Sequence, residues 1–181
     1  MSRAVAPVVS TILMVAVVVI LAAVLSVFAL GFTEDTGGEA PIVGQSSGAF
    51  EAFEDGSDEQ IVTIRHVAGD TIPVEEMEVA VSATCKGGTK RGRLVELPVD
   101  GYYGNAIGEQ NVEGSDIFDG SYGQFYGDVG ALDDDTFTAG ETIQFRIGKG
   151  DCEVPDSGTV TVRVIHVPTN AVVITQELTA R

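Results

Sequence analysis

Charged residues are nearly absent from the beginning of the chain, and basic residues are scarce in the remainder. No Asp, Glu, Lys or Arg lies between Ala4 and Phe32. All 27 acidic residues and nine of the ten basic residues follow Phe32, so residues 33–181 carry a formal charge of 9 − 27 = −18. A surface this acidic repels polyanions, which excludes nucleic acids and anionic lipid headgroups as its partners.

The excess of carboxylates also bears on the salt concentration that suits the protein. Carboxylates crowded on one surface repel each other, and the range of this repulsion falls to about 3 Å near molar ionic strength. The composition therefore favours a protein of a halophile. An acidic domain that works at ordinary salt is the alternative.

Cysteine and histidine are scarce as well, which limits metal and redox chemistry. Cys85 and Cys152 fit neither a zinc-ligand spacing nor a CxxC motif. Outside the cell we expect them to pair, and a crosslink closing so long a loop contributes about 4 kcal/mol in the chain-entropy model. In the cytosol two reduced core thiols are the alternative.

The only histidines, His66 and His166, make a poor zinc site without cysteines or carboxylates, and we expect them at the surface, at strand ends.

Motifs of catalysis are also missing. The sequence contains no nucleophile elbow, P-loop or dinucleotide fingerprint. The aspartates at 133–135, with Asp128 and Glu141 nearby, lack the alternating spacing of a calcium-binding EF-hand loop. We expect a solvated acidic turn there, with a loosely bound cation as the alternative. The sequence therefore predicts a protein that is not an enzyme and has no cofactor and no metal.

The uncharged segment at residues 4–32 consists mainly of Val, Ala, Leu and Ile. As a helix with a rise of about 1.5 Å per residue it would reach roughly 43 Å, whereas about 20 apolar residues suffice to span a bilayer. It is about twice as long as the apolar core of a cleavable signal peptide. Its polar residues are too few to form a stripe, so we expect a helix that is apolar on all sides and surrounded by lipid or by other helices.

The flanks of this segment suggest how it is oriented. Pro7 lies where its fixed φ and missing N–H suit the first turn of a helix. Arg3 precedes the segment, and Glu34 and Asp35 follow it. The positive-inside rule therefore places the N-terminus in the cytoplasm and the rest of the chain outside the cell.

The sequence from Arg3 to Phe32, RAVAPVVSTILMVAVVVILAAVLSVFALGF, resembles the N-terminal domain of haloarchaeal type IV pilins. In that family a short charged leader precedes an Ala-Val-Ser-Pro-Val-like start, an Ile-Leu-Met-Val-Ala core and a Leu-Gly-Phe-like end. Hydrophobicity alone does not require these features, which makes the resemblance specific. The residues that carry it are Pro7, Ile12, Leu13, Met14, Leu30, Gly31 and Phe32.

The resemblance implies that a prepilin peptidase on the cytoplasmic side removes Met1 to Arg3 and leaves Ala4 as the mature N-terminus. The helix is then kept in the membrane, and pilus assembly machinery joins copies of the chain through it into a helical filament. Ala6 stands where the family usually has Ser, and the leader is short, so cleavage between Ser2 and Arg3 is the alternative. A membrane anchor that never assembles is the other interpretation of the same helix.

After the apolar segment the sequence pattern changes. Residues 33–48 are rich in Gly, Ser, Thr and acidic residues, which predicts a linker. Beyond it, alternation of apolar and polar residues predicts strands at 61–67, 77–83, 142–147, 160–164 and 172–178, the last two joined by a turn at Pro168 to Asn170. These short strands favour an α+β chain, in which a long apolar N-terminal helix is followed by an antiparallel, immunoglobulin-like β-sandwich head at 49–181.

Two segments of the predicted head are candidates for recognition. Four of its nine basic residues lie within eight positions, beside Cys85, and suit the acidic face of a neighbouring subunit. A loop neutralised within one head is the alternative. These residues are Lys86, Lys90, Arg91 and Arg93. Residues 101–130 hold eight glycines, all four tyrosines, Phe118 and Phe125, which either contact surfaces, glycans or the next subunit, or fill the core.

The sequence thus predicts a leader at 1–3, a transmembrane and polymerisation helix at 4–32, a linker at 33–48 and an extracellular head at 49–181. The predicted function is that of a structural subunit of an archaeal type IV pilus-like filament that serves surface adhesion. A membrane-anchored surface-binding domain that does not polymerise is the alternative. The predicted partners are copies of the chain itself, the prepilin peptidase, the assembly machinery and the membrane.

Overall fold

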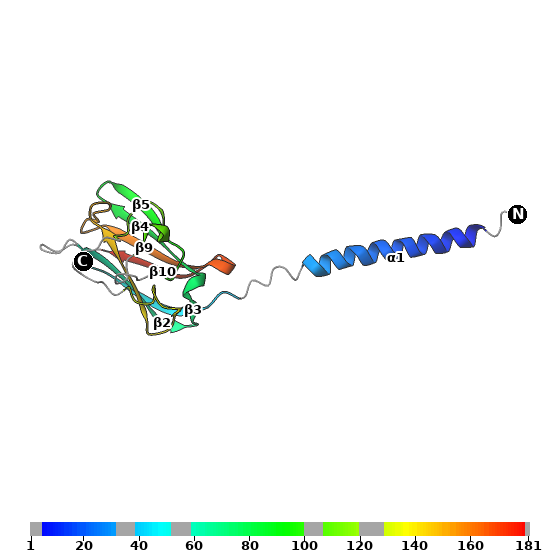
Figure 1. Ribbon diagram of the computed structural model, residues 1–181, viewed down its shortest axis with the longest axis horizontal. Coiled ribbons are helices and arrows are strands. Elements are labelled where there is room, and N and C mark those ends of the chain that lie inside the picture. The colour runs from blue at the N-terminus through cyan, green and yellow to red at the C-terminus, as the bar shows by residue number, and fades with distance from the viewer. Residues whose placement is uncertain (1–4, 32–38, 52–58, 100–106, 120–128, 180–181) are drawn as a thin grey trace. The chain divides into compact units, whose positions relative to one another are not determined.

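The computed structural model describes residues 5–31, 39–51, 59–99, 107–119 and 129–179. The chain divides into two compact units, Met1–Glu39 and Ala40–Arg181. In the described residues the first unit contains the helix α1, and the second, called the head below, contains the strands (Figure 1).

The apolar segment forms the predicted helix, α1, which runs from Val5 to Gly31. Its 27 residues correspond to a length of about 40 Å. Pro7 lies in the first turn, where its missing N–H breaks no helical hydrogen bond. The hydroxyl of Ser26 donates a hydrogen bond of 2.8 Å to the carbonyl of Ala22. This polar group is therefore satisfied within the helix itself and does not require water.

The head contains two main antiparallel sheets and one small one. The three-stranded sheet has the order β1 (Val43–Glu51), β2 (Glu59–Gly69) and β8 (Thr142–Gly148). The five-stranded sheet has the order β10 (Ala171–Thr179), β9 (Thr159–His166), β4 (Met77–Cys85), β5 (Gly88–Leu94) and β6 (Val112–Gly114). The small sheet pairs β3 (Ile72–Pro73) with β7 (Thr136–Phe137). Short 3₁₀ turns occupy Val74–Glu76, Glu109–Asn111 and Val167–Thr169.

The core lies between the two main sheets, because the central strands turn their apolar residues toward the opposite sheet. In β4 the odd-numbered residues Met77 to Cys85 are buried, while the residues between them are wholly or partly exposed. The strands β2, β8 and β9 show the same alternation, as the sequence predicts. The predicted terminal hairpin is also confirmed, with Asn170 in the left-handed conformation at its turn. The α+β class and the sandwich-like head are therefore correct.

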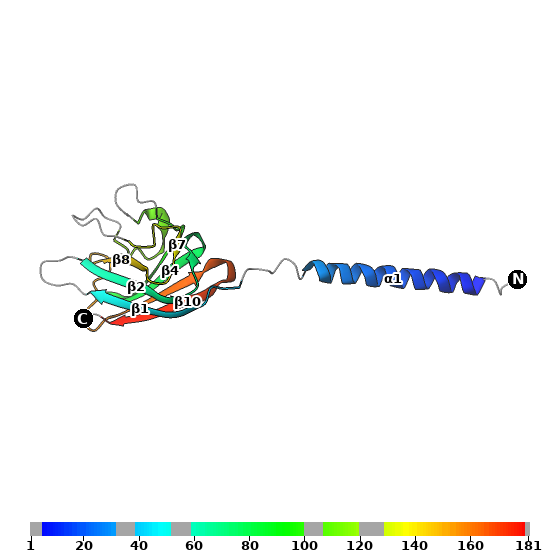
Figure 2. The same ribbon diagram turned by 90° about the horizontal axis from the view of Figure 1, so that it is seen from below.

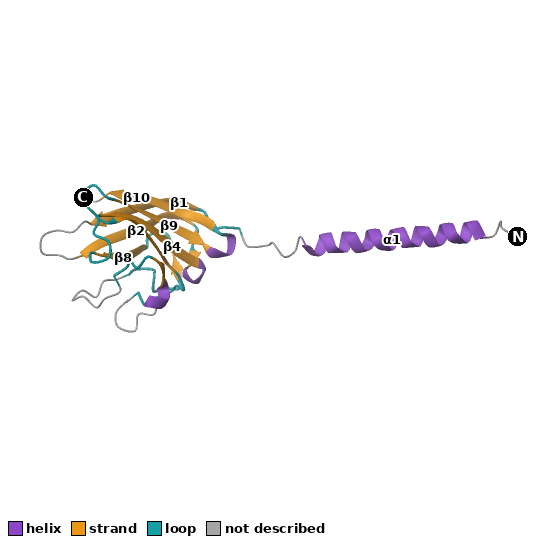
Figure 3. Cartoon of the chain, turned by 90° about the horizontal axis from the view of Figure 1, so that it is seen from above, coloured by secondary structure: helices purple, strands orange, loops and turns teal. Residues whose placement is uncertain are grey.

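One edge of the sandwich brings the two sheets together. Strand β1 is at one edge of the three-stranded sheet and β10 is at one edge of the five-stranded sheet, and these two strands lie side by side (Figures 2 and 3). The side chain of Gln176 donates hydrogen bonds to the carbonyl and hydroxyl oxygens of Ser46, at 3.1 and 2.8 Å. Gly48 allows this close approach, since a Cβ atom there would lie 2.7 Å from the Leu178 side chain. The edge strands are thus held together by side-chain contacts.

The linker is shorter than the sequence predicts. The compact head already begins at Ala40, and residues 43–48, assigned to the linker, form the first part of β1. In this strand Phe50 is the one buried residue, so alternation is too weak to reveal it. Its strand conformation comes instead from pairing with β2 along its length.

The prediction that both histidines lie at the surface is wrong. His66 is 0% exposed and His166 is 4% exposed. The ring of His66 packs at 5.3 Å from that of Phe137, and neither ring nitrogen has a hydrogen-bond partner among the described residues. His166 contacts the hydroxyl of Thr169 at 2.8 Å and the carboxylate of Glu76 at 3.1 Å. The two histidines also belong to different sheets, His66 to the three-stranded sheet and His166 to the five-stranded sheet.

The described part of residues 101–130 supports the core-filling interpretation of its aromatic residues. Phe118 is buried, and its ring meets that of Phe145 edge-on at 5.5 Å. Single bridges from Phe118 to Ile147 and from Gly130 to Ile143 place this segment along the free edge of β8. The four tyrosines and Phe125 lie outside the described residues.

Candidate functional site

The described side chains of α1 form a surface that is apolar and exposed on every side. Between Val9 and Ser26, where side chains are described, the window has a mean hydropathy of 2.8 and none of it is buried. Ile12, Leu13 and Met14, which resemble the family's core motif, are 65%, 60% and 72% exposed. A soluble protein rarely exposes so large an apolar surface, so another apolar environment must cover this one.

The dimensions of α1 suit a membrane. By length and composition, α1 is long enough and apolar enough to cross a bilayer. A helix of about 40 Å exceeds a hydrocarbon core of about 30 Å. The excess leaves roughly two turns of apolar helix to extend beyond the hydrocarbon, tilt within it or contact other protein.

Comparison with known families identifies this segment. The family model described as archaeal type IV pilin, N-terminal, matches residues 3–44. The chain carries an archaeal type IV pilin N-terminal domain. The match begins at Arg3, includes all of α1 and ends at Gly44 in β1, so it confirms the family that the sequence predicts. A search among curated proteins finds no match to the chain.

The match to the pilin N-terminal domain includes the whole of α1. Pilins are structural, non-enzymatic proteins that self-assemble into filaments. Pro7, Leu30 and Gly31 all lie in α1. The predicted cleavage site, Arg3 and Ala4, and the last family residue, Phe32, lie outside the described residues.

The head contains the disulfide that the sequence predicts for an exported chain. Cys85 at the end of β4 is bonded to Cys152 in the segment between β8 and β9, with a Cα–Cα distance of 5.0 Å. The bond closes a loop with a sequence separation of 67 residues. It links the five-stranded sheet to the segment that leaves the three-stranded sheet, so it joins the two layers of the sandwich.

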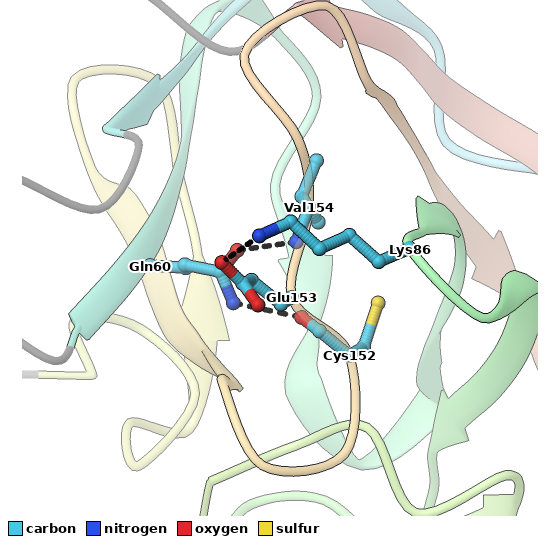
Figure 4. A network of polar contacts seen from close by, with 5 residues as sticks. All are labelled: Gln60, Lys86, Cys152, Glu153 and Val154. Carbon is cyan, nitrogen blue, oxygen red and sulfur yellow. Dashed lines mark hydrogen bonds and ion pairs between the residues drawn. The ribbon is translucent and has the colours of Figure 1, made fainter.

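A buried glutamine fixes the same segment from the other sheet (Figure 4). Gln60 of β2 is 0% exposed, and its amide nitrogen donates to the carbonyls of Ile147 and Cys152 at 3.2 and 2.8 Å. Its amide oxygen accepts a bond of 2.7 Å from the backbone N–H of Val154. One side chain thereby satisfies three buried backbone groups next to the disulfide. The sequence offers no signal for this role, because Gln60 occurs one residue before the predicted strand.

Removal of the Gln60 amide is expected to destabilise the head strongly. Gln60→Leu keeps the volume but leaves the Cys152 carbonyl and the Val154 N–H unpaired in the interior, and each such group costs roughly 1–3 kcal/mol. We expect a loss of about 3 kcal/mol in the free energy of unfolding, measured by denaturant titration of the chain in detergent.

Gln176 provides the matched control, because it also bonds a backbone carbonyl but is only partly buried. Gln176→Leu is expected to lose about 1 kcal/mol, since water replaces the lost partner. Equal losses in the two variants would show that Gln60 has no special anchoring role.

The four clustered basic residues do not form one patch. Lys86 pairs with Glu153, and Arg93 pairs with Glu78 at 3.0 Å, so these two are neutralised within the head. Arg91 and Arg93 alternate with the buried residues Gly92 and Leu94, whereas Lys90 precedes Arg91 and points to the other side of β5. Only Arg91 and Arg93 therefore share a face.

The acidic turn at 133–135 is exposed, as the sequence predicts. Glu141 does not belong to it, because its carboxylate accepts a bond of 2.6 Å from the backbone N–H of Thr138 within its own turn. Asp128 lies outside the described residues. Within the described ranges no group of three or more His, Cys, Asp or Glu side chains is arranged to hold a metal ion.

Proposed function

We propose that this chain is a structural subunit of an extracellular archaeal type IV pilus-like filament and polymerises through α1. The observation that carries the proposal is the combination of a pilin N-terminal domain with a helix that is apolar and exposed on every side. Each copy waits in the bilayer with α1 in lipid. On assembly the helices leave lipid and pack against each other. Because lipid is already apolar, this transfer gains nothing from excluding water, and helix packing and head contacts drive it instead.

Processing and orientation complete this proposal. A prepilin peptidase cleaves between Arg3 and Ala4, and the retained helix becomes the N-terminus of the mature subunit. Arg3 keeps the start of the chain in the cytoplasm, so the head is displayed outside. The Cys85–Cys152 bond supports this orientation, because disulfides persist in oxidising compartments and are rare in the cytosol.

The composition of the head suggests where the filament works. A charge of −18 on residues 33–181 is best tolerated at high ionic strength, where the repulsion between carboxylates is screened. We therefore place the filament on a halophilic cell, where it serves adhesion to surfaces.

Fractionation of cells that produce the protein tests the proposal. The filament account predicts that mild shearing releases the chain into a high-speed pellet of extracellular filaments, while a second pool remains in the membrane. Control cells lacking the assembly machinery should retain the membrane pool and lose the sheared pool. A chain found in membranes alone, with the same shearing releasing other filaments, would instead identify a simple anchor.

A further inference from the structure

The outer face of the five-stranded sheet carries arginines on both sides of a strand of small residues. Ala80 of β4 is paired with Arg93 of β5 on one side and with Arg163 of β9 on the other. One row further along, Ser82 is paired with Arg91 and with Thr161. Because neighbouring strands are about 4.8 Å apart, Arg93 and Arg163 flank Ala80 at a backbone separation of about 10 Å.

All three arginines point away from the core. Arg91, Arg93 and Arg163 are exposed; buried residues lie on both sides of Arg93 and Arg163, and the buried Gly92 follows Arg91. Arg93 is partly neutralised by Glu78 at 3.0 Å. Among the described residues, Arg91 and Arg163 have no ion-pair partner. The sequence does not reveal this grouping, since Arg163 lies 70 positions after Arg93 and only sheet pairing brings it near.

These side chains border a groove. It has a volume of about 480 Å³, within the usual range of small binding sites. Ala80, Ser82 and Gly92 line it together with the three arginines, while Glu113 of β6 adds one opposing charge. The lining therefore carries three positive charges and one negative charge, in a chain whose formal charge is −17.

We propose that this arginine groove binds the acidic turn Asp133–Asp135 of a second copy of the chain; the inference rests on the proposed function and names a contact within the filament. The turn presents the neighbouring exposed carboxylates of Asp134 and Asp135, which are opposite in charge to Arg91 and Arg163, the two groove arginines outside the ion pair with Glu78. Guanidinium and carboxylate groups form short, directional paired hydrogen bonds. Direct pairs at about 3 Å also persist at molar salt, where longer-range attraction is screened.

The geometry of such a contact suits a filament. The groove lies on the β4, β5 and β9 surface, whereas the turn precedes β7, so the two partners are different surfaces of the same chain. A contact between two different surfaces is heterologous. It leaves a free groove and a free turn at the ends of every assembly, and it therefore propagates into an open polymer unless a ring closes.

Charge reversal of full-length chains in the producing cells tests this proposal. Arg91→Glu with Arg163→Glu, and separately Asp134→Lys with Asp135→Lys, are each expected to lower the sheared filament by about tenfold or more while the membrane pool is unchanged. A chain with all four changes has an acidic groove and a basic turn, and we expect it to recover filament yield. The exposed Arg65 of β2, on the other sheet, provides the control Arg65→Glu, which should assemble normally.

Each outcome discriminates. Normal assembly of the groove variant overturns the proposal, and so does failure of the fourfold variant to recover while its thermal unfolding matches that of the wild type. If the turn variant assembles normally but the groove variant does not, the occupant is another anion, and the proposed partner is wrong. Absence of filaments from wild-type cells would instead refute the proposed function, whereas these variants test only the contact.

Discussion

Two aspartates in the middle of α1 are expected to remove the chain from the membrane and to abolish filament formation. Val15 and Val18 lie near the centre of the window Val9–Ser26 and are 63% and 56% exposed. An aspartate at the centre of a membrane helix costs about 3 kcal/mol, so Val15→Asp with Val18→Asp costs about 6 kcal/mol. The measurement is the fraction of the chain that stays in membranes after alkaline extraction, together with the sheared filament yield.

The matched control for this experiment keeps the helix apolar. Val15→Leu with Val18→Leu preserves hydrophobicity and slightly raises helix propensity, so insertion should be unchanged. Filament yield in this control reports how closely neighbouring helices pack around these positions. If the double aspartate chain stays in membranes and filaments at the wild-type level, α1 is covered neither by lipid nor by other helices.

Loss of the disulfide is expected to cause the largest change in stability of the head. The bond between Cys85 and Cys152 closes a loop with a sequence separation of 67 residues, worth about 4 kcal/mol in the chain-entropy model. Cys85→Ala with Cys152→Ala should therefore lower the Tm of the head by roughly 10–20 °C. Thermal unfolding of the full chain in detergent, followed by circular dichroism of the β-structure, measures the change.

Reduction of the wild-type protein separates the crosslink from the side chains. A reductant should lower the Tm of the wild type toward that of the double alanine chain and leave the latter unchanged. Agreement between the two treatments assigns the loss to the crosslink. A wild-type Tm that does not respond to a reductant able to reach the bond would mean that the Gln60 contacts and the ion pair between Lys86 and Glu153 alone hold this segment.

Features encoded by local sequence pattern were predictable. The uncharged run gave α1, and strict alternation gave β2, β4, β8 and the terminal hairpin, because in each case burial repeats at the period of the element. The family resemblance also rests on contiguous residues and is confirmed by the match to residues 3–44. The disulfide was predictable from the expectation of export, because a chain with two cysteines can form only one intramolecular disulfide.

Features that depend on distant residues were not predictable. In β5 only Gly92 and Leu94 follow an inward pattern, so its basic residues suggested a charged loop. Gly92 is buried because the backbone of Ser115 and the ring of Phe118 approach it, and a Cβ atom would lie 2.7 Å from the Ser115 carbonyl. The arginine groove likewise depends on the register between β4, β5 and β9. The burial of His66 depends on Phe137, which lies 71 positions further along the chain.

The N-terminal sequence of the chain isolated from sheared extracellular filaments tests the central claim most directly. A polymerising pilin must lose its leader but keep α1, so the account predicts a mature chain that begins at Ala4 and is otherwise complete. Intact mass measurement of the same sample verifies that the helix and head remain joined. A chain that retains Met1 and occurs only in membranes, or a released chain that lacks α1, would contradict it.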